Sequence, residues 1–120
     1  ILLSIGTNDL SIGRTPAQVS ESIVSLTKEI KSCHPSAKLI VTGILPRRTH
    51  HQQRIKTNKM LEKQSASAGF TYLDIDKAFP TETKNGKPII RGLCPDQLHP
   101  NSEGYQHLSN AILKHINSSQ

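Results

Sequence analysis

The chain has 120 residues with 34% hydrophobic content, enough for a modest core, and no apolar run approaches the ~18 residues that cross a membrane. The formal net charge is +6, but only 3% of the residues are aromatic, so stacking platforms for single-stranded nucleic acid are scarce. Cys33 and Cys94 are isolated in the sequence and predict reduced thiols. These features favour a globular cytoplasmic protein with no nucleic-acid partner and no transmembrane segment.

The chain opens with a predicted strand followed by a helix. Residues 1–5 are almost entirely apolar, which predicts a strand buried on both faces. Thr15 as N-cap, Pro16 at the first helical position and Gln18 reaching back predict a helix start. The helix is expected to end at His34-Pro35. Its apolar residues recur at helical spacing on one face: Val19, Ile23, Leu26 and Ile30.

The same alternation continues through the middle of the chain. Residues 38–42 predict a second strand, and residues 51–68 predict a helix stopped by Gly69. Residues 70–75 predict a third strand. The inward-facing residues expected on this second helix are Ile55, Met60 and Leu61. Strands that alternate with helices indicate a parallel sheet with helices on both faces.

Residues 77–95 are rich in Gly and Pro and include Asn85-Gly86, so they predict loop and turn. The last helix is expected to start at Asn101 or Ser102 and to leave a polar tail at residues 117–120. Its expected inward face carries Tyr105, Leu108, Ala111, Ile112 and Ile116.

Positive charge is densest over residues 47–63, which we interpret as a basic loop followed by a solvated helix face. His50-His51 lies in this loop without a third ligand at zinc spacing, so no metal site is expected.

Two short motifs near the chain ends carry side chains suited to general-base and oxyanion chemistry. Asp96 stands three residues before His99, so its carboxylate can orient an imidazole that acts as a base. Gly6-Thr7-Asn8-Asp9 follows the first strand, where Asn8 can aim its amide at a developing oxyanion. Taken alone, Asp96 and His99 also fit a helix cap before Asn101, and Asn8-Asp9 also fits a plain turn after a strand. Their joint occurrence at predicted carboxyl ends of the sheet favours an active site.

With these motifs the chain resembles the SGNH (GDSL-type) hydrolases, and among them the catalytic subunits of the intracellular platelet-activating-factor acetylhydrolase. Gly6-Thr7-Asn8-Asp9 resembles the third sequence block of that family, and residues 96–100 resemble the last block. Residues 39–47 resemble the middle strand and following loop of the subgroup. The resemblance runs over residues 1–116 and implies a three-layer α/β/α, flavodoxin-like fold with a parallel sheet.

The resemblance also implies a role for each motif residue. Asp96 is expected to orient His99, the general base. Asn8 is expected to bind the oxyanion, with Gly6 allowing close approach of the backbone. Asp9 is expected to be structural and to hold the loop after the strand.

The nucleophile is the part of such a site that has no candidate in this chain. Ser4 lies inside the first predicted strand, and Ser102 follows His99 too closely for the usual attack geometry. The family's first two blocks, with the nucleophilic serine and an oxyanion-hole glycine, have no counterpart here. We therefore expect a fold incomplete at its N-terminus, with residues 1–116 as a partial hydrolase domain and residues 117–120 as its tail.

The function implied by the resemblance is that of a serine ester hydrolase acting on carboxylic esters with short acyl groups such as acetyl. It needs no cofactor and no metal. The expected partner is a small ester substrate, lipid esters included, and a homodimer or heterodimer is left open. This chain alone is expected to be inactive. The alternative is a non-catalytic subunit or degenerate paralogue acting through protein contacts, and a basic RNA-binding module is the weakest option.

Overall fold

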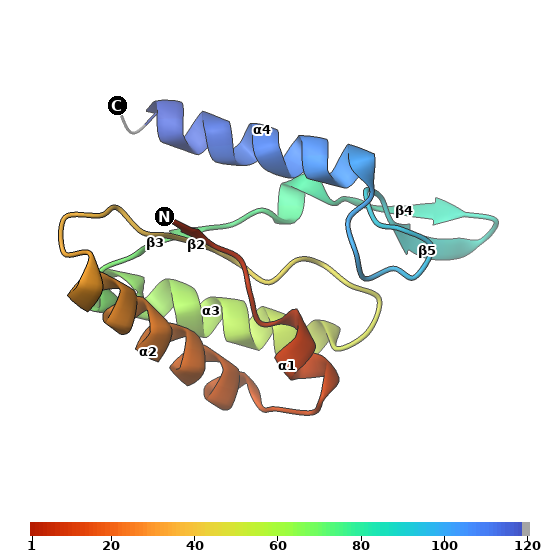
Figure 1. Cartoon of the computed structure of the whole chain (residues 1–120). Coiled ribbons are helices and arrows are strands. Elements are labelled where there is room, and N and C mark those ends of the chain that lie inside the picture. Colours follow the sequence, from red (N-terminus) through yellow and green to blue (C-terminus); the bar gives the residue numbers. More distant parts are fainter. Residues whose placement is uncertain (119–120) are drawn as a thin grey trace. The chain divides into compact units, whose positions relative to one another are not determined.

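The computed structural model describes residues 1–118, which divide into two compact units (Figure 1). The first unit comprises Ile1–Ile44 and His50–Asp74 and holds a three-stranded sheet with two long helices. The second comprises Leu45–Thr49 and the residues from Ile75 onwards, and it holds a two-stranded sheet and the last helix. No helix within residues 1–118 is long and apolar enough to cross a membrane.

The sheet of the first unit is parallel. Its strands are β1 (Leu2–Leu3), β2 (Ile40–Thr42) and β3 (Thr71–Leu73), in the order β1-β2-β3. β2 is therefore the central strand, and its Ile40 pairs with both neighbours. Strands joined by helices and paired in parallel are the arrangement that the alternating sequence pattern predicts.

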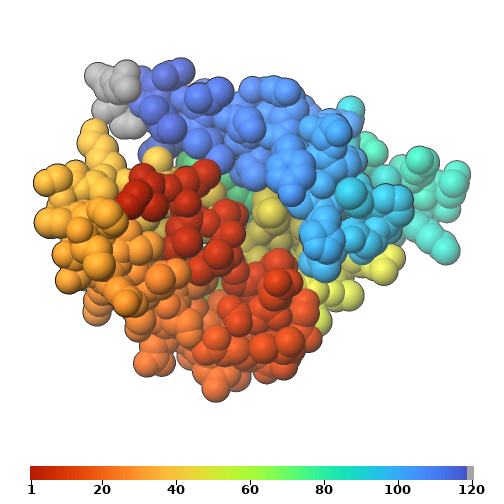
Figure 2. Space-filling model, in the orientation of Figure 1, coloured from red at the N-terminus to blue at the C-terminus, as the bar shows by residue number. Residues whose placement is uncertain are grey.

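β1 differs from the prediction of a strand buried on both faces. It pairs with β2 alone among the described strands, and Ile1, Leu2 and Ile5 are exposed, Leu2 by 47%. The dark red N-terminal residues accordingly lie at the surface in Figure 2. An apolar run reports the character of its side chains but not the number of neighbouring strands, and burial on both faces is not observed where β1 has β2 as its one described neighbour.

Helix α2 (Pro16–Cys33) starts as its sequence predicts. The backbone N–H of Gln18 donates to Thr15 Oγ1 at 3.1 Å, and the backbone N–H of Thr15 donates to Gln18 Oε1 at 2.9 Å. This reciprocal capping box satisfies two backbone donors that the first helical turn leaves unpaired. The helix ends at His34, as predicted from the following proline.

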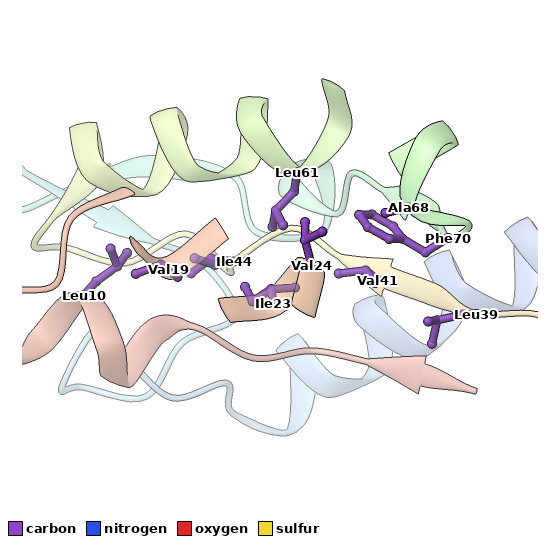
Figure 3. Close-up of a cluster of buried hydrophobic side chains, with 10 residues drawn as sticks. All are labelled: Leu10, Val19, Ile23, Val24, Leu39, Val41, Ile44, Leu61, Ala68 and Phe70. Atoms are coloured by element: carbon purple, nitrogen blue, oxygen red, sulfur yellow. The ribbon is translucent and has the colours of Figure 1, made fainter. Parts of the chain in front are cut away.

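Helix α3 (His51–Ala68) has the predicted bounds and ends at Gly69, whose φ of 82° favours glycine. α2 and α3 lie side by side and pack with the sheet around one apolar core (Figures 1 and 3). Each fully buried aliphatic side chain there contributes about 1.5–3 kcal/mol. The core residues are Leu10, Val19, Ile23, Val24, Leu39, Val41, Ile44, Leu61, Ala68 and Phe70.

The basic stretch over residues 47–63 is less solvated than predicted. Arg54 is only 3% exposed, and its Nη1 donates to the Ile44 carbonyl at 3.2 Å. Asn58 is also buried and pairs with both the N–H and the C=O of Ile44. Arg47 is buried as well, and its burial lowers the pKa of the guanidinium. Helix α3 directs Arg54 and Asn58 inward, where they satisfy the backbone groups of Ile44 after β2.

In the second unit, a β-hairpin occupies part of the segment that was predicted as loop. A 3₁₀ turn, η1 (Asp76–Ala78), precedes β4 (Thr81–Lys84) and β5 (Lys87–Ile90), which pair antiparallel. Asn85 and Gly86 join them with φ of 53° and 75°, the two positive values that a tight hairpin turn requires. The turn was predicted, but the strands were not. β4 is polar and exposed, and the two half-buried isoleucines of β5, Ile89 and Ile90, are adjacent, so neither strand has the apolar alternation that identifies a hairpin.

Helix α4 (Ser102–Ser118) begins after Asn101, whose Oδ1 accepts from the Gly104 N–H at 2.9 Å. Gly104 is buried where the helix approaches Gly92 and Phe79 closely. The predicted inward face is only partly confirmed: Leu108, Ala111 and Ile112 are half-buried, whereas Tyr105 and Ile116 are exposed. The helix also includes 117 and 118 of the expected tail, and 119–120 lie outside the described residues.

Candidate active site

Asp96 and His99 lie together in the loop that precedes α4. The His99 ring Nδ1 lies 2.7 Å from Asp96 Oδ2. The other carboxylate oxygen, Oδ1, accepts from the backbone N–H of Leu98 at 2.9 Å and of His99 at 3.1 Å. The carboxylate is therefore fixed by its own turn at one oxygen and presents the other to the imidazole.

These hydrogen bonds stabilise the ionised form of Asp96. The His99 side chain, followed by the backbone N–H groups of His99 and Leu98, lowers the pKa of the carboxyl from 3.8 to about 2. Asp96 is thus an anion at neutral pH and can only accept hydrogen bonds. It follows that Nδ1 of His99 carries the proton.

A proton on Nδ1 leaves the lone pair of a neutral imidazole on Nε2. The His99 side chain is 68% exposed, so this atom is open to solvent and to a reactant. Within residues 1–118, the ring hydrogen-bonds Asp96 alone. An oriented imidazole with a free Nε2 and an anionic partner on Nδ1 is the arrangement of a general base.

The loop around the pair is closed by backbone hydrogen bonds. The Cys94 N–H donates to the His99 carbonyl at 2.7 Å, and Leu93 forms an antiparallel bridge with Pro100. Asn101 extends this closure, because its N–H donates to the Gly92 carbonyl at 2.8 Å. The ends of the loop are therefore joined directly before α4 begins.

Gly6 and Asn8 belong to the first unit, where β1 is followed by α1 (Thr7–Ser11). Gly6 has φ of 117°, and a Cβ at this position would lie 2.9 Å from Ile44 Cδ1 and 3.4 Å from Ile23 Cδ1. Only glycine combines this backbone angle with so close an approach. Asn8 is exposed in the single short helix that follows.

Asp9 ties this segment to α2. Its Oδ1 lies 3.3 Å from Arg14 Nη1, and Arg14 Nη2 donates to Ser22 Oγ at 2.8 Å. The arrangement agrees with the structural role expected for Asp9.

The two serines considered in the sequence lie in different surroundings. Ser4 Oγ accepts from Thr42 Oγ1 at 2.9 Å in the sheet unit, and Ser102 is the first residue of α4. Neither forms a hydrogen bond with the His99 ring among the residues described. Over the same residues, no group of three or more His, Cys, Asp or Glu side chains is placed to hold a metal ion.

We expect the Asp96 carboxyl to titrate near pH 2 in the folded chain. A lowered pKa means that the folded state binds fewer protons than the unfolded state, so the stabilisation is complete above about 3.8 and is lost as pH falls through about 2. Carbon-13 NMR of the carboxyl gives the midpoint directly. His99→Ala removes the largest cause of the lowered pKa, the hydrogen bond from the His99 side chain, and should raise the titration midpoint. A midpoint near 3.8 in the unmodified chain would contradict the hydrogen bonds described for Asp96.

A sequence model described as the GDSL-like lipase/acylhydrolase family matches residues 1–107. No curated protein matches the sequence. Among solved structures, a Bacteroides fragilis protein assigned as an acylhydrolase is similar with a TM-score of 0.79 and 22% identity, over 98% of this chain and 61% of that one. A carbohydrate esterase family 3 protein from Talaromyces cellulolyticus has a TM-score of 0.75 and 22% identity, over 98% and 56%.

A third similar structure is the esterase domain of the ORF1 protein from the zebrafish ZfL2-1 retrotransposon, with a TM-score of 0.68 and 22% identity, over 97% of this chain and 67% of that one. These similarities confirm the predicted α/β fold with a parallel sheet. The chain spans 61% of the length of the Bacteroides fragilis protein and 56% of the length of the Talaromyces cellulolyticus esterase.

Proposed function

Because the chain belongs to the GDSL-like lipase/acylhydrolase family, we propose that it forms the C-terminal part of a serine esterase in which His99 is the general base and Asp96 orients it. The observation that carries the proposal is the 2.7 Å contact between His99 Nδ1 and an anionic Asp96, with Nε2 left open. Residues 1–116 are proposed as part of one hydrolase domain.

The reaction begins when a serine outside this chain attacks the carbonyl carbon of an ester. His99 Nε2 takes the hydroxyl proton as the bond forms, and Asp96 stabilises the resulting imidazolium. The same proton then passes to the alkoxide that leaves, which gives an alcohol and an acyl-enzyme. In the second half, water attacks the acyl group, His99 takes a proton from the water and returns it to the serine, and the carboxylic acid is released.

Asn8 is proposed to bind the negative oxygen that develops on the attacked carbonyl. Its side-chain amide is a donor, and the residue is exposed in the first turn of α1, which follows β1. Gly6 is buried, with the side chains of Ile44 and Ile23 close to its backbone, and its positive φ provides the turn that leads from β1 to Asn8. Donors directed at the oxyanion lower the barrier because they stabilise charge that exists only in the transition state.

The substrates are proposed to be esters of short acyl groups such as acetyl. Residues 39–47 resemble the corresponding segment of the platelet-activating-factor acetylhydrolase catalytic subunits, and this resemblance supports membership of that subgroup. The carbohydrate esterase among the similar structures supports ester hydrolysis in general.

The 120-residue chain alone is expected to show no esterase activity, since it contains no candidate nucleophile. Neither turnover of p-nitrophenyl acetate nor covalent labelling by a fluorophosphonate probe should be detectable. Labelling of any serine in this chain would contradict the proposal. The full-length protein encoded by the transcript is the positive control, and it should turn over the ester and be labelled outside these residues.

A full-length protein that lacks both activities while folding normally would favour the non-catalytic alternative. The coding sequence upstream of Ile1 separates the two functions as well. A Gly-Asp-Ser triplet there supports the esterase, and a stop codon supports a degenerate copy.

A further inference from the structure

Gln97, between the two proposed catalytic residues, has a backbone conformation that side-chain-bearing residues rarely adopt. Its φ is 54°, and only two other non-glycine residues in the part of the chain that the structure describes have a positive φ, His50 and Asn85. Such an angle persists where surrounding contacts hold it. The contacts of Gln97 therefore bear on the geometry of the turn.

The Gln97 side chain is bound to strand β5. Its Oε1 accepts from the Ile90 N–H at 2.7 Å, and its Nε2 donates to the Ile90 carbonyl at 3.4 Å. Nε2 also lies 3.5 Å from the Cys94 carbonyl. The amide thus pairs with both polar groups of one strand residue, much as a neighbouring strand would.

The Gln97 backbone is held as well. Its N–H donates to the Cys94 carbonyl at 2.8 Å, and its own carbonyl accepts from the Arg48 N–H at 3.1 Å. Both the side chain and the main chain of this one residue therefore attach the turn to its surroundings in the second unit.

The dihedral angles of Gln97 decide where the next two N–H groups point. These groups belong to Leu98 and His99, and both donate to Asp96 Oδ1. If Gln97 left its left-handed conformation, they would turn away from the carboxylate, and Asp96 would lose the support that directs Oδ2 at the His99 ring.

We propose that Gln97 is a positioning residue that fixes the Asp96–His99 turn against β5. The functional meaning of this role rests on the proposed esterase activity, but the geometry does not. Gln97 acts through the turn and through Asp96, and has no contact of its own with a reactant. The hairpin β4–β5 thereby becomes a structural support of the site.

Two substitutions test the side-chain contacts of Gln97 separately from its backbone conformation. Gln97→Gly removes the link to β5 but adopts a positive φ without strain. Gln97→Asn also tolerates a positive φ, but its amide is one methylene too short to reach Ile90. In both variants we expect the pH midpoint for titration of the Asp96 carboxyl to rise from about 2 toward 3.8, as measured by NMR in the 120-residue chain.

The Ile90 amide supplies a second measurement. Without its acceptor, it should exchange with solvent about tenfold faster in both variants. Gln52→Ala, at an exposed position of α3, is the matched control and should change neither quantity. A merely structural role would lower the melting temperature but would leave the Asp96 midpoint of the folded chain unchanged.

Variants that keep both the low Asp96 midpoint and the slow Ile90 exchange would overturn the proposal. If Gln97→Gly does not fold, Gln97→Asn decides. Neither measurement needs a substrate, so a full-length protein without esterase activity would contradict the proposed function and leave this result intact.

Discussion

Replacing His99 with alanine is expected to lower kcat of the full-length protein by about 10⁴-fold or more. In the proposed mechanism the ring takes the serine proton in one step and the water proton in the next, and among residues 1–118 no other side chain is hydrogen-bonded to Asp96. The chain should still fold, because the His99 side chain is 68% exposed and fills no core. Steady-state hydrolysis of p-nitrophenyl acetate gives kcat, and circular dichroism checks the fold.

His107→Ala is the matched control for this loss. His107 is also exposed, and it lies on α4 with its Nε2 3.5 Å from Glu103. Its removal should change kcat little. A His99→Ala protein with the kcat of the control would show that another group is the base.

Replacing Asp96 with asparagine should cost about 10³–10⁴-fold in kcat. A carboxylate only accepts, so it keeps the proton on Nδ1 of His99 and the lone pair on Nε2. The asparagine amide can instead donate to Nδ1 and stabilise the other tautomer, whose Nε2 already carries a proton. Such a ring cannot remove the proton of the nucleophile.

The tautomer explanation has its own measurement. Nitrogen-15 NMR of the His99 ring should show the proton on Nδ1 in the unmodified protein and on Nε2 after Asp96→Asn. Glu62→Gln, an exposed carboxylate of α3, is the control for the loss of one negative charge and should keep kcat. An unchanged tautomer with an unchanged kcat would remove Asp96 from the mechanism.

The parts of the fold that follow from the sequence are those with local causes. The start of α2 depends on Thr15 and Gln18, three residues apart, and the end of α3 depends on Gly69 alone. Neither signal needs knowledge of the rest of the chain. The partners of β1 and the burial of Arg54 could not be predicted from local signals, because they depend on which segments become neighbours.

The candidate site divides along the same line. Asp96 and His99 are three residues apart on one turn, so their contact is a local property of the sequence. The role proposed for Gln97 requires β5, and neither strand of this hairpin has the alternating pattern that would have revealed it. A polar residue between two motif positions carries no signal of its own.

The most direct test of the general-base proposal is chemical rescue of the His99→Ala full-length protein by imidazole. With the ring removed, a free imidazole can occupy the vacated position beside Asp96 and take the serine proton. We expect p-nitrophenyl acetate hydrolysis, corrected for the reaction of imidazole itself, to rise with imidazole concentration in His99→Ala and to stay constant in the unmodified protein. Hydrolysis by His99→Ala at the unmodified rate, with no dependence on imidazole, would contradict the assignment of His99 as the base.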